Sequence, residues 1–96
     1  MIIVNQDKKA IHNFDNISSI QIEESNIAYE LIVYDQINDR DSLGTYETRE
    51  RAREVLEEII NMYKATESFK VAANRISDNV GALAIKKGFA YYMPLQ

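Results

Sequence analysis

The chain has 96 residues, of which 46% are hydrophobic and 27% charged, and this is the length and composition of one globular domain spanning residues 1–96. It contains no cysteine, which excludes disulfides, thiolate catalysis and cysteine-based zinc sites and fits a reducing compartment. The apolar N-terminal stretch is too short for a signal peptide or a membrane span, so we expect a cytoplasmic protein with no membrane partner.

The net charge of −4 is unevenly distributed. Residues 1–66 carry 13 acidic and 7 basic side chains, whereas residues 67–96 carry two acidic and four basic ones. Non-specific nucleic-acid binding depends on neutralising phosphates, so we do not expect it of an acidic chain. The basic last third can still hold a small anion.

The first half of the chain predicts a series of short strands. Its β-branched and aromatic residues occur in short runs, and several of the runs alternate apolar and polar positions. Polar turns of a few residues separate the runs, and this favours hairpins over parallel crossovers. The expected strands are residues 2–4, 10–14, 19–23, 27–34 and 43–46, with turns at 6–9, 15–16 and 25–26 and a loop at 38–42.

A helix is predicted over residues 48–65. Thr48 can act as its N-cap, because a threonine hydroxyl accepts a hydrogen bond from a free amide of the first turn. The opposite face is charged. The apolar stripe, at helical spacing, consists of Ala52, Val55, Leu56, Ile59, Ile60 and Tyr63.

The last third predicts a second helical segment, over about residues 67–87, followed by a final strand at 89–93. Asn79 and Gly81 interrupt this segment, so one helix and two short helices both remain open. The predicted fold is therefore α+β: a small antiparallel sheet of five or six strands, packed on one face by the helix at 48–65.

Two patterns that resemble functional sites carry no assignment. Asp39, Asp41, Gly44 and Glu50 have the spacing of an EF-hand calcium loop, but Leu43 takes a ligand position and a strand precedes the loop. We interpret this segment as an acidic turn. We assign no metal, cofactor or catalytic residue, and we expect the protein not to be an enzyme.

His12 is the single histidine, and it lies in a predicted strand. Asp15 follows it by three positions, which on a strand turns its side chain to the opposite face. We interpret His12 as a structural or exposed residue.

The basic and aromatic segment at 86–92 is the one candidate ligand site. Lysines can neutralise a phosphate, and tyrosine rings can stack on a base. A favoured alternative is a core strand, in which Phe89 and Tyr91 face inwards and the lysines end a helix. The candidate ligand-binding residues are Asn74, Arg75, Lys86, Lys87, Tyr91 and Tyr92.

The same segment predicts self-association. A small sheet with an aromatic last strand leaves an open edge, and residues 89–93 contain no lysine or proline that would prevent pairing. We therefore expect a homo-oligomer, most simply a two-fold dimer.

Three blocks of the sequence carry a resemblance. Residues 1–7, the block LGTYETRERAREVL at 43–56 and the end YYMP at 91–94 resemble a family of short, mostly uncharacterised proteins encoded by phages and mobile elements of Gram-positive bacteria. In that family the helix leads more directly to the final strand, so residues 66–87 are longer than the resemblance implies, and we expect any feature peculiar to this chain to lie there. The resemblance implies a genomic setting rather than an activity.

Small phage proteins without catalytic residues often act by binding, so the resemblance leads us to expect a non-catalytic antagonist of host immunity in the host cytoplasm. One form is a sponge, an oligomer that sequesters a nucleotide immune signal. The alternative is a nucleic-acid mimic that inhibits a host defence nuclease through its acidic surface. The partners expected are a small anionic nucleotide or a host defence protein.

Overall fold

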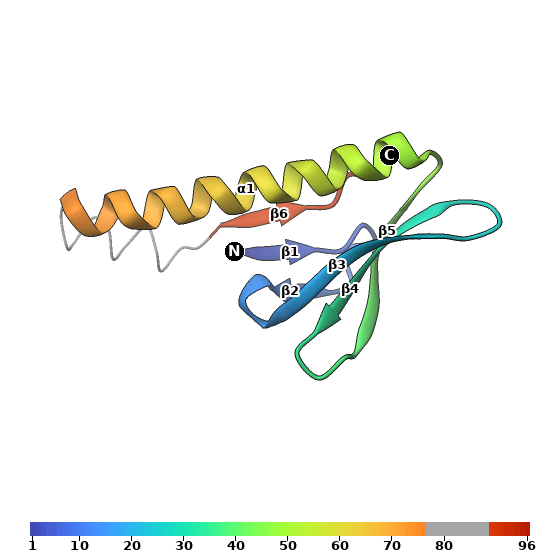
Figure 1. Cartoon of the computed structure of the whole chain (residues 1–96), viewed down its shortest axis with the longest axis horizontal. Helices are drawn as coiled ribbons and strands as arrows, with labels where there is room; N and C mark the ends of the chain where they lie inside the picture. The colour runs from blue at the N-terminus through green and yellow to red at the C-terminus, as the bar shows by residue number, and fades with distance from the viewer. Residues whose placement is uncertain (77–88) are drawn as a thin grey trace.

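The computed structural model describes residues 1–76 and 89–96, and these fold as one helix and six strands arranged in two three-stranded sheets (Figure 1). The predicted α+β class is confirmed. The strands are β1 (Ile2–Val4), β2 (Ile11–Asn13), β3 (Ile17–Glu24), β4 (Tyr29–Asp35), β5 (Arg40–Tyr46) and β6 (Ala90–Tyr92); a 3₁₀ turn, η1 (Phe14–Asn16), precedes β3, and the helix is α1 (Arg49–Ile76).

Three of the strands, in the order β3-β4-β5, form sheet B, in which both neighbouring pairs are antiparallel. The turn from β4 to β5 places Asn38 at a φ of 67°, a left-handed conformation that asparagine tolerates. The Asp35 carboxylate supports this turn by accepting from the amides of Ile37 and Asp39, both at 2.9 Å. β5 begins at Arg40, three residues earlier than predicted, because the polar residues after the turn already pair with β4.

The other three strands, in the order β2-β1-β6, form sheet A. β1 and β2 make the predicted hairpin, with Lys8 at a φ of 61° in its turn. β6 pairs with β1 in parallel, with Ile3 opposite Tyr91. The prediction of a single antiparallel sheet is wrong in this respect, because β6 arrives after the helix and no turn fixes its direction relative to β1.

Thr48 caps α1 as predicted: its hydroxyl accepts from the amide of Arg51 at 3.1 Å. The predicted end at residue 65 is wrong, since the helix continues to Ile76 and takes in the first part of the expected second segment. Residues 66–76 contain no glycine or proline that would stop it. The rest of the second segment, 77–87, lies outside the described residues. No described helix is long and apolar enough to cross a membrane.

A single core joins the helix to both sheets. Ala52, Val55 and Ile59 on α1 are fully buried, and they belong to one cluster with Leu31 of sheet B and Ile3 of sheet A. The predicted burial of the helix stripe against a β-layer is therefore confirmed. Burying each large aliphatic side chain contributes about 1.5–3 kcal/mol.

The outer part of the helix stripe is less covered. Ile60 and Tyr63 are 38% and 39% exposed, although the Tyr63 ring stacks on Phe14 with centroids 4.8 Å apart. Figure 1 shows α1 running alongside β6 and extending beyond the sheets at its C-terminal end. The core thus lies under the first half of the helix.

Gln6 connects the two sheets. Its backbone amide donates to the Leu43 carbonyl at 2.8 Å, and its side chain exchanges hydrogen bonds with the backbone of Thr45. The same Nε2 donates to the carbonyls of Pro94 and Leu95, each at 3.0 Å. Gly44 leaves room for this contact, because a Cβ there would stand 3.2 Å from the Gln6 Cβ. The start of sheet A is thereby fixed to β5 and to the segment after β6.

Candidate functional site

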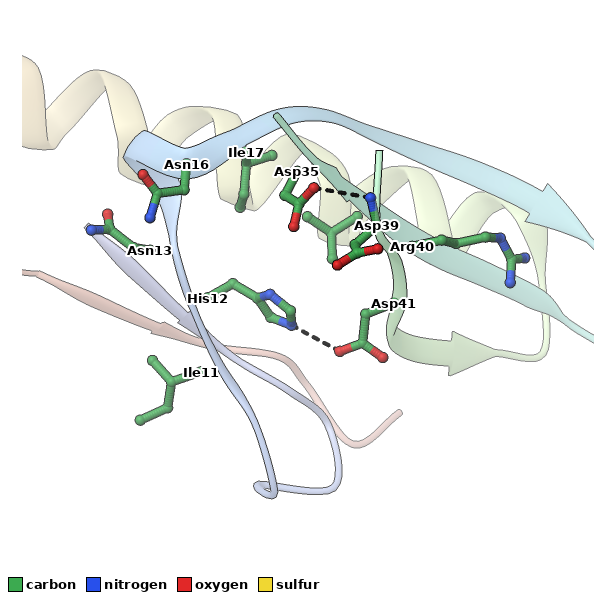
Figure 2. A pocket seen from close by; sticks show the side chains of 10 residues that line it. Ile11, His12, Asn13, Asn16, Ile17, Asp35, Asp39, Arg40 and Asp41 are labelled. Atoms are coloured by element: carbon green, nitrogen blue, oxygen red, sulfur yellow. Dashed lines mark hydrogen bonds and ion pairs between the residues drawn. The ribbon is translucent and has the colours of Figure 1, made fainter. Parts of the chain in front are cut away.

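A cleft of about 480 Å³ opens where the end of β2 faces the ends of β4 and β5 (Figure 2). Its volume lies within the range of about 300–1,000 Å³ usual for ligand pockets. Ile11, Ile17 and Val33 supply its apolar lining. The other lining residues are polar: Asn13, Asn16, His12, Arg40, Asp35, Asp39 and Asp41.

His12 reaches across the cleft to Asp41, and its Nε2 lies 2.9 Å from the Asp41 Oδ2. Asn5 donates to the same carboxylate oxygen at 3.2 Å and to the Ser42 carbonyl at 3.1 Å. The side chains of His12 and Asp41 are 22% and 49% exposed. The pair therefore links sheet A to sheet B at a position that solvent reaches.

Sequence reasoning missed this pair. His12 and Asp41 are 29 positions apart, and neither local spacing nor alternation connects them. Their approach depends on how the two sheets meet, which no single segment specifies. Among the described residues Asp41 is the one side chain hydrogen-bonded to His12, so the ring has an orienting carboxylate but no hydroxyl nucleophile beside it.

Arg40 does not neutralise the cleft. Its guanidinium turns away from the cleft (Figure 2) and donates to Glu23 at 2.9 Å. Hydrogen bonds from Tyr34, at 2.6 Å, and from Arg40 hold the pKa of Glu23 below its usual value, so Glu23 remains an anionic partner for the guanidinium. The charge facing the cleft comes from its carboxylates.

The three carboxylates differ in how far they are already engaged. Asp35 supports the β4–β5 turn, and Asp41 accepts from His12, Asn5 and the Ser42 amide. Within residues 1–76 and 89–96, the Asp39 carboxylate has no hydrogen-bonding or ion-pairing partner. Asp39 is therefore the carboxylate most available to a ligand.

The two tyrosines of the predicted ligand site lie on β6 and face in different directions. Tyr91 is buried, and its hydroxyl donates to Glu58 at 2.5 Å. Burial, and then Glu58, raise the pKa of Tyr91 above its usual value. Tyr92 is 64% exposed. This alternation matches the core-strand interpretation of the segment and leaves Tyr92 as the ring that a ligand can reach.

The other residues of that predicted site lie only partly within the described residues, so their assembly stays a prediction. Asn74 and Arg75 lie in the last turn of α1, and Lys86 and Lys87 fall outside the described residues. Tyr92 instead borders a shallow groove of about 510 Å³ between α1 and β6. The helix side of this groove is formed by Glu58, Asn61, Met62 and Ala65.

β6 lies at one edge of sheet A, as the self-association prediction requires. Ala90 and Tyr92 are exposed along this edge. Among the described strands, none pairs with β6 on the side away from β1. The edge and the groove beside it form one surface on which an extended chain can pair.

In the part of the chain that the structure describes, no group of three or more histidine, aspartate or glutamate side chains is placed to hold a metal ion. The segment with EF-hand spacing, residues 39–50, is mostly strand β5 and the start of α1, and it follows a strand, β4, and not the helix that an EF-hand needs. Comparisons with protein-family models, with curated proteins and with solved structures find no match to this chain.

Proposed function

We propose that this chain is a non-catalytic binding protein which, in the phage setting that its sequence resemblance implies, inhibits a host defence nuclease inside the host cell. The observation that carries the proposal is the acidic cleft between the two sheets. Asp35, Asp39 and Asp41 gather there, and the nearby guanidinium of Arg40 is engaged by Glu23.

Nucleases bind their substrates through basic surfaces that neutralise phosphates. A rigid surface with clustered carboxylates competes for such a surface, and its charge also speeds association. Asp15 belongs to the same end of the molecule, since it follows β2 in η1 and is exposed. We call this surface, formed by Asp15, Asp35, Asp39 and Asp41, the acidic end. Its residues come from or follow strands of both sheets, and the shared core holds the two sheets together.

The test uses purified defence nucleases of a Gram-positive host, with DNA cleavage as the readout. The protein should inhibit cleavage, and the inhibitory concentration should rise steeply with salt. The double variant Asp15→Asn/Asp39→Asn should need roughly tenfold more protein for the same inhibition, about 1.4 kcal/mol in binding. The matched control is Glu50→Gln/Glu57→Gln, which removes the same charge from the exposed face of α1.

Inhibition that is insensitive to salt, or equal loss in both double variants, would show that this acidic end is not the inhibitory surface. Absence of inhibition across the nuclease panel, together with no gain of plaquing in hosts that carry those nucleases, would refute the function.

A second function, sequestration of a nucleotide immune signal, is favoured by the exposed Tyr92 beside the α1–β6 groove. In it the base stacks on Tyr92, and the phosphates contact Arg75, Lys86 and Lys87. A calorimetric screen with cyclic nucleotides and ADP-ribose derivatives tests it. Binding should weaken in Tyr92→Ala, and failure of Arg75→Ala, Lys86→Ala and Lys87→Ala to affect phage challenge would end it.

The homo-oligomer is part of this second function, because a shared site needs more than one copy. We propose that two copies pair through the edge of β6 that no described strand occupies. Light scattering should report a dimer for the unmodified protein and a monomer for Tyr92→Lys, which places a charge on that edge. A monomeric unmodified protein at high concentration would contradict the pairing.

A further inference from the structure

We propose that the cleft between the two sheets binds an arginine side chain presented by a partner protein. This inference rests on the proposed function and adds to it the chemistry of the contact. It depends on the shape of the cleft, on an exposed apolar wall and on an available carboxylate.

The cleft is large enough for a side chain and apolar enough for its stem. Its volume of about 480 Å³ is many times the share of one water in the liquid, about 30 Å³. Ile17 and Val33 line it from β3 and β4, and Ile11 lines it from β2. Ile11 is 64% exposed and is the open part of this wall, whereas Val33 is buried beneath it. A methylene stem lying along this wall would cover it.

The polar groups suit a guanidinium head. Figure 2 shows the amides of Asn13 and Asn16 at one side of the cleft and the carboxylates at the other. A guanidinium carries five N–H donors in a plane and can reach acceptors in different directions. Asp39 is the carboxylate without a described partner, so it is the acceptor that a bidentate contact would use.

Other ligand classes fit less well. A phosphate would meet three carboxylates, with the Arg40 guanidinium turned towards Glu23. The described carboxylates are not grouped closely enough for a metal ion. An ammonium suits the charge, but it is a compact, strongly hydrated ion, and one wall of this cleft is formed by Ile11 and Ile17. The arginine guanidinium is more weakly hydrated, so it loses less hydration free energy when it enters the cleft.

The experiment is an NMR titration with N-acetyl-arginine-N-methylamide, a capped arginine that needs no partner protein. We expect saturable shifts at His12, Ile17 and Val33 in the millimolar range. The same compound made with citrulline has the same shape without the charge, and it should bind at least tenfold more weakly. The capped lysine compound should also bind more weakly than capped arginine.

Variants locate the contact. Asp39→Asn should weaken capped-arginine binding roughly tenfold, and Ile11→Ser should weaken it severalfold, since both side chains are exposed and neither substitution removes a buried group. Glu57→Gln on α1 is the matched control and should leave binding unchanged. Equal binding of arginine and citrulline, equal binding of arginine and lysine, or no effect of Asp39→Asn would each overturn the assignment.

This test separates the inference from the proposed function. Capped arginine that binds in the cleft, with no nuclease inhibited, would leave the cleft assignment standing and remove the function. Nuclease inhibition without capped-arginine binding would keep the function and remove the assignment.

Discussion

The two sheets of this protein differ in how far apart in the sequence their paired strands lie. In sheet B each strand pairs with the next one along the chain, and short turns such as that at Asn38 set the register. In sheet A, β1 pairs with the last strand, and Gln6 contacts a carbonyl 88 positions away. Bringing such distant segments together costs more chain entropy than closing a hairpin.

Sheet A therefore needs contacts that sheet B does not. The core cluster supplies one set, since Ile3 and Tyr91 pack with Leu31 and Ile59. The hydrogen bonds of Gln6 supply another, because they reach both β5 and the segment after β6. If these contacts account for the closure of sheet A, the two sheets unfold together, although their pairing differs.

The largest expected effect comes from the core. Ile3→Ala in sheet A and Leu31→Ala in sheet B each remove a fully buried aliphatic side chain, and each should cost about 3 kcal/mol in the free energy of unfolding. Chemical denaturation should show one transition in both variants, because one cluster contains both residues. A second transition in Ile3→Ala alone would mean that sheet A melts independently.

Gln6→Ala tests the junction between the sheets. It removes the side-chain contacts with the backbone of Thr45, Pro94 and Leu95, in which the two Nε2 hydrogens are shared among three carbonyls, and we expect a loss of about 2 kcal/mol with faster amide exchange at Thr45. Gln21→Ala, an exposed glutamine on β3, is the control and should change stability by less than about 0.5 kcal/mol. Similar losses in both variants would show that the Gln6 contacts contribute no more to stability than an exposed glutamine on one sheet.

The same contrast explains what could be predicted from the sequence. The hairpins of sheet B and the Thr48 cap depend on neighbouring residues, and the patterns that predicted them are local. The parallel pairing of β6 and the His12–Asp41 contact depend on segments far apart, so alternation could not identify them. The start of β5 was missed for another reason: Arg40 and Asp41 are polar strand residues at the cleft, where no buried face imposes alternation.

Alkaline pH should weaken the tyrosine contacts near β6. Burial raises the pKa of Tyr46 to about 12, and burial with Glu58 raises that of Tyr91. The unfolded chain releases these protons near pH 10, so the native state holds them longer and stability falls as pH rises above that value. The slope should reach about 1.4 kcal/mol per pH unit for each tyrosine.

Tyr91→Phe should remove the Tyr91 share of this slope. It should also cost about 1.5 kcal/mol near neutral pH, because the bond to the Glu58 carboxylate is lost. Tyr92→Phe, on the exposed side of the same strand, should change neutral-pH stability by less than about 0.5 kcal/mol. Denaturant titrations at several pH values measure both quantities. If the free energy of unfolding of Tyr91→Phe fell with alkaline pH as steeply as that of the unmodified protein, Tyr91 would not be the tyrosine that keeps its proton in the folded state.

The smallest expected effect lies at Thr48, where the chain passes from β5 into α1. Thr48→Ala removes the hydroxyl that accepts from the Arg51 amide and should lower the free energy of unfolding by about 1 kcal/mol. Thr48→Ser keeps a hydroxyl at this position and should retain most of that stability. The cap is exposed, so water replaces part of the lost bond. Ala52 and Val55, however, enter the core from the turns just after it. A loss near 3 kcal/mol would mean that the cap also helps to position the helix on sheet B. In that case the losses of the Thr48→Ala and Leu31→Ala single variants would not add up to the loss of the double variant.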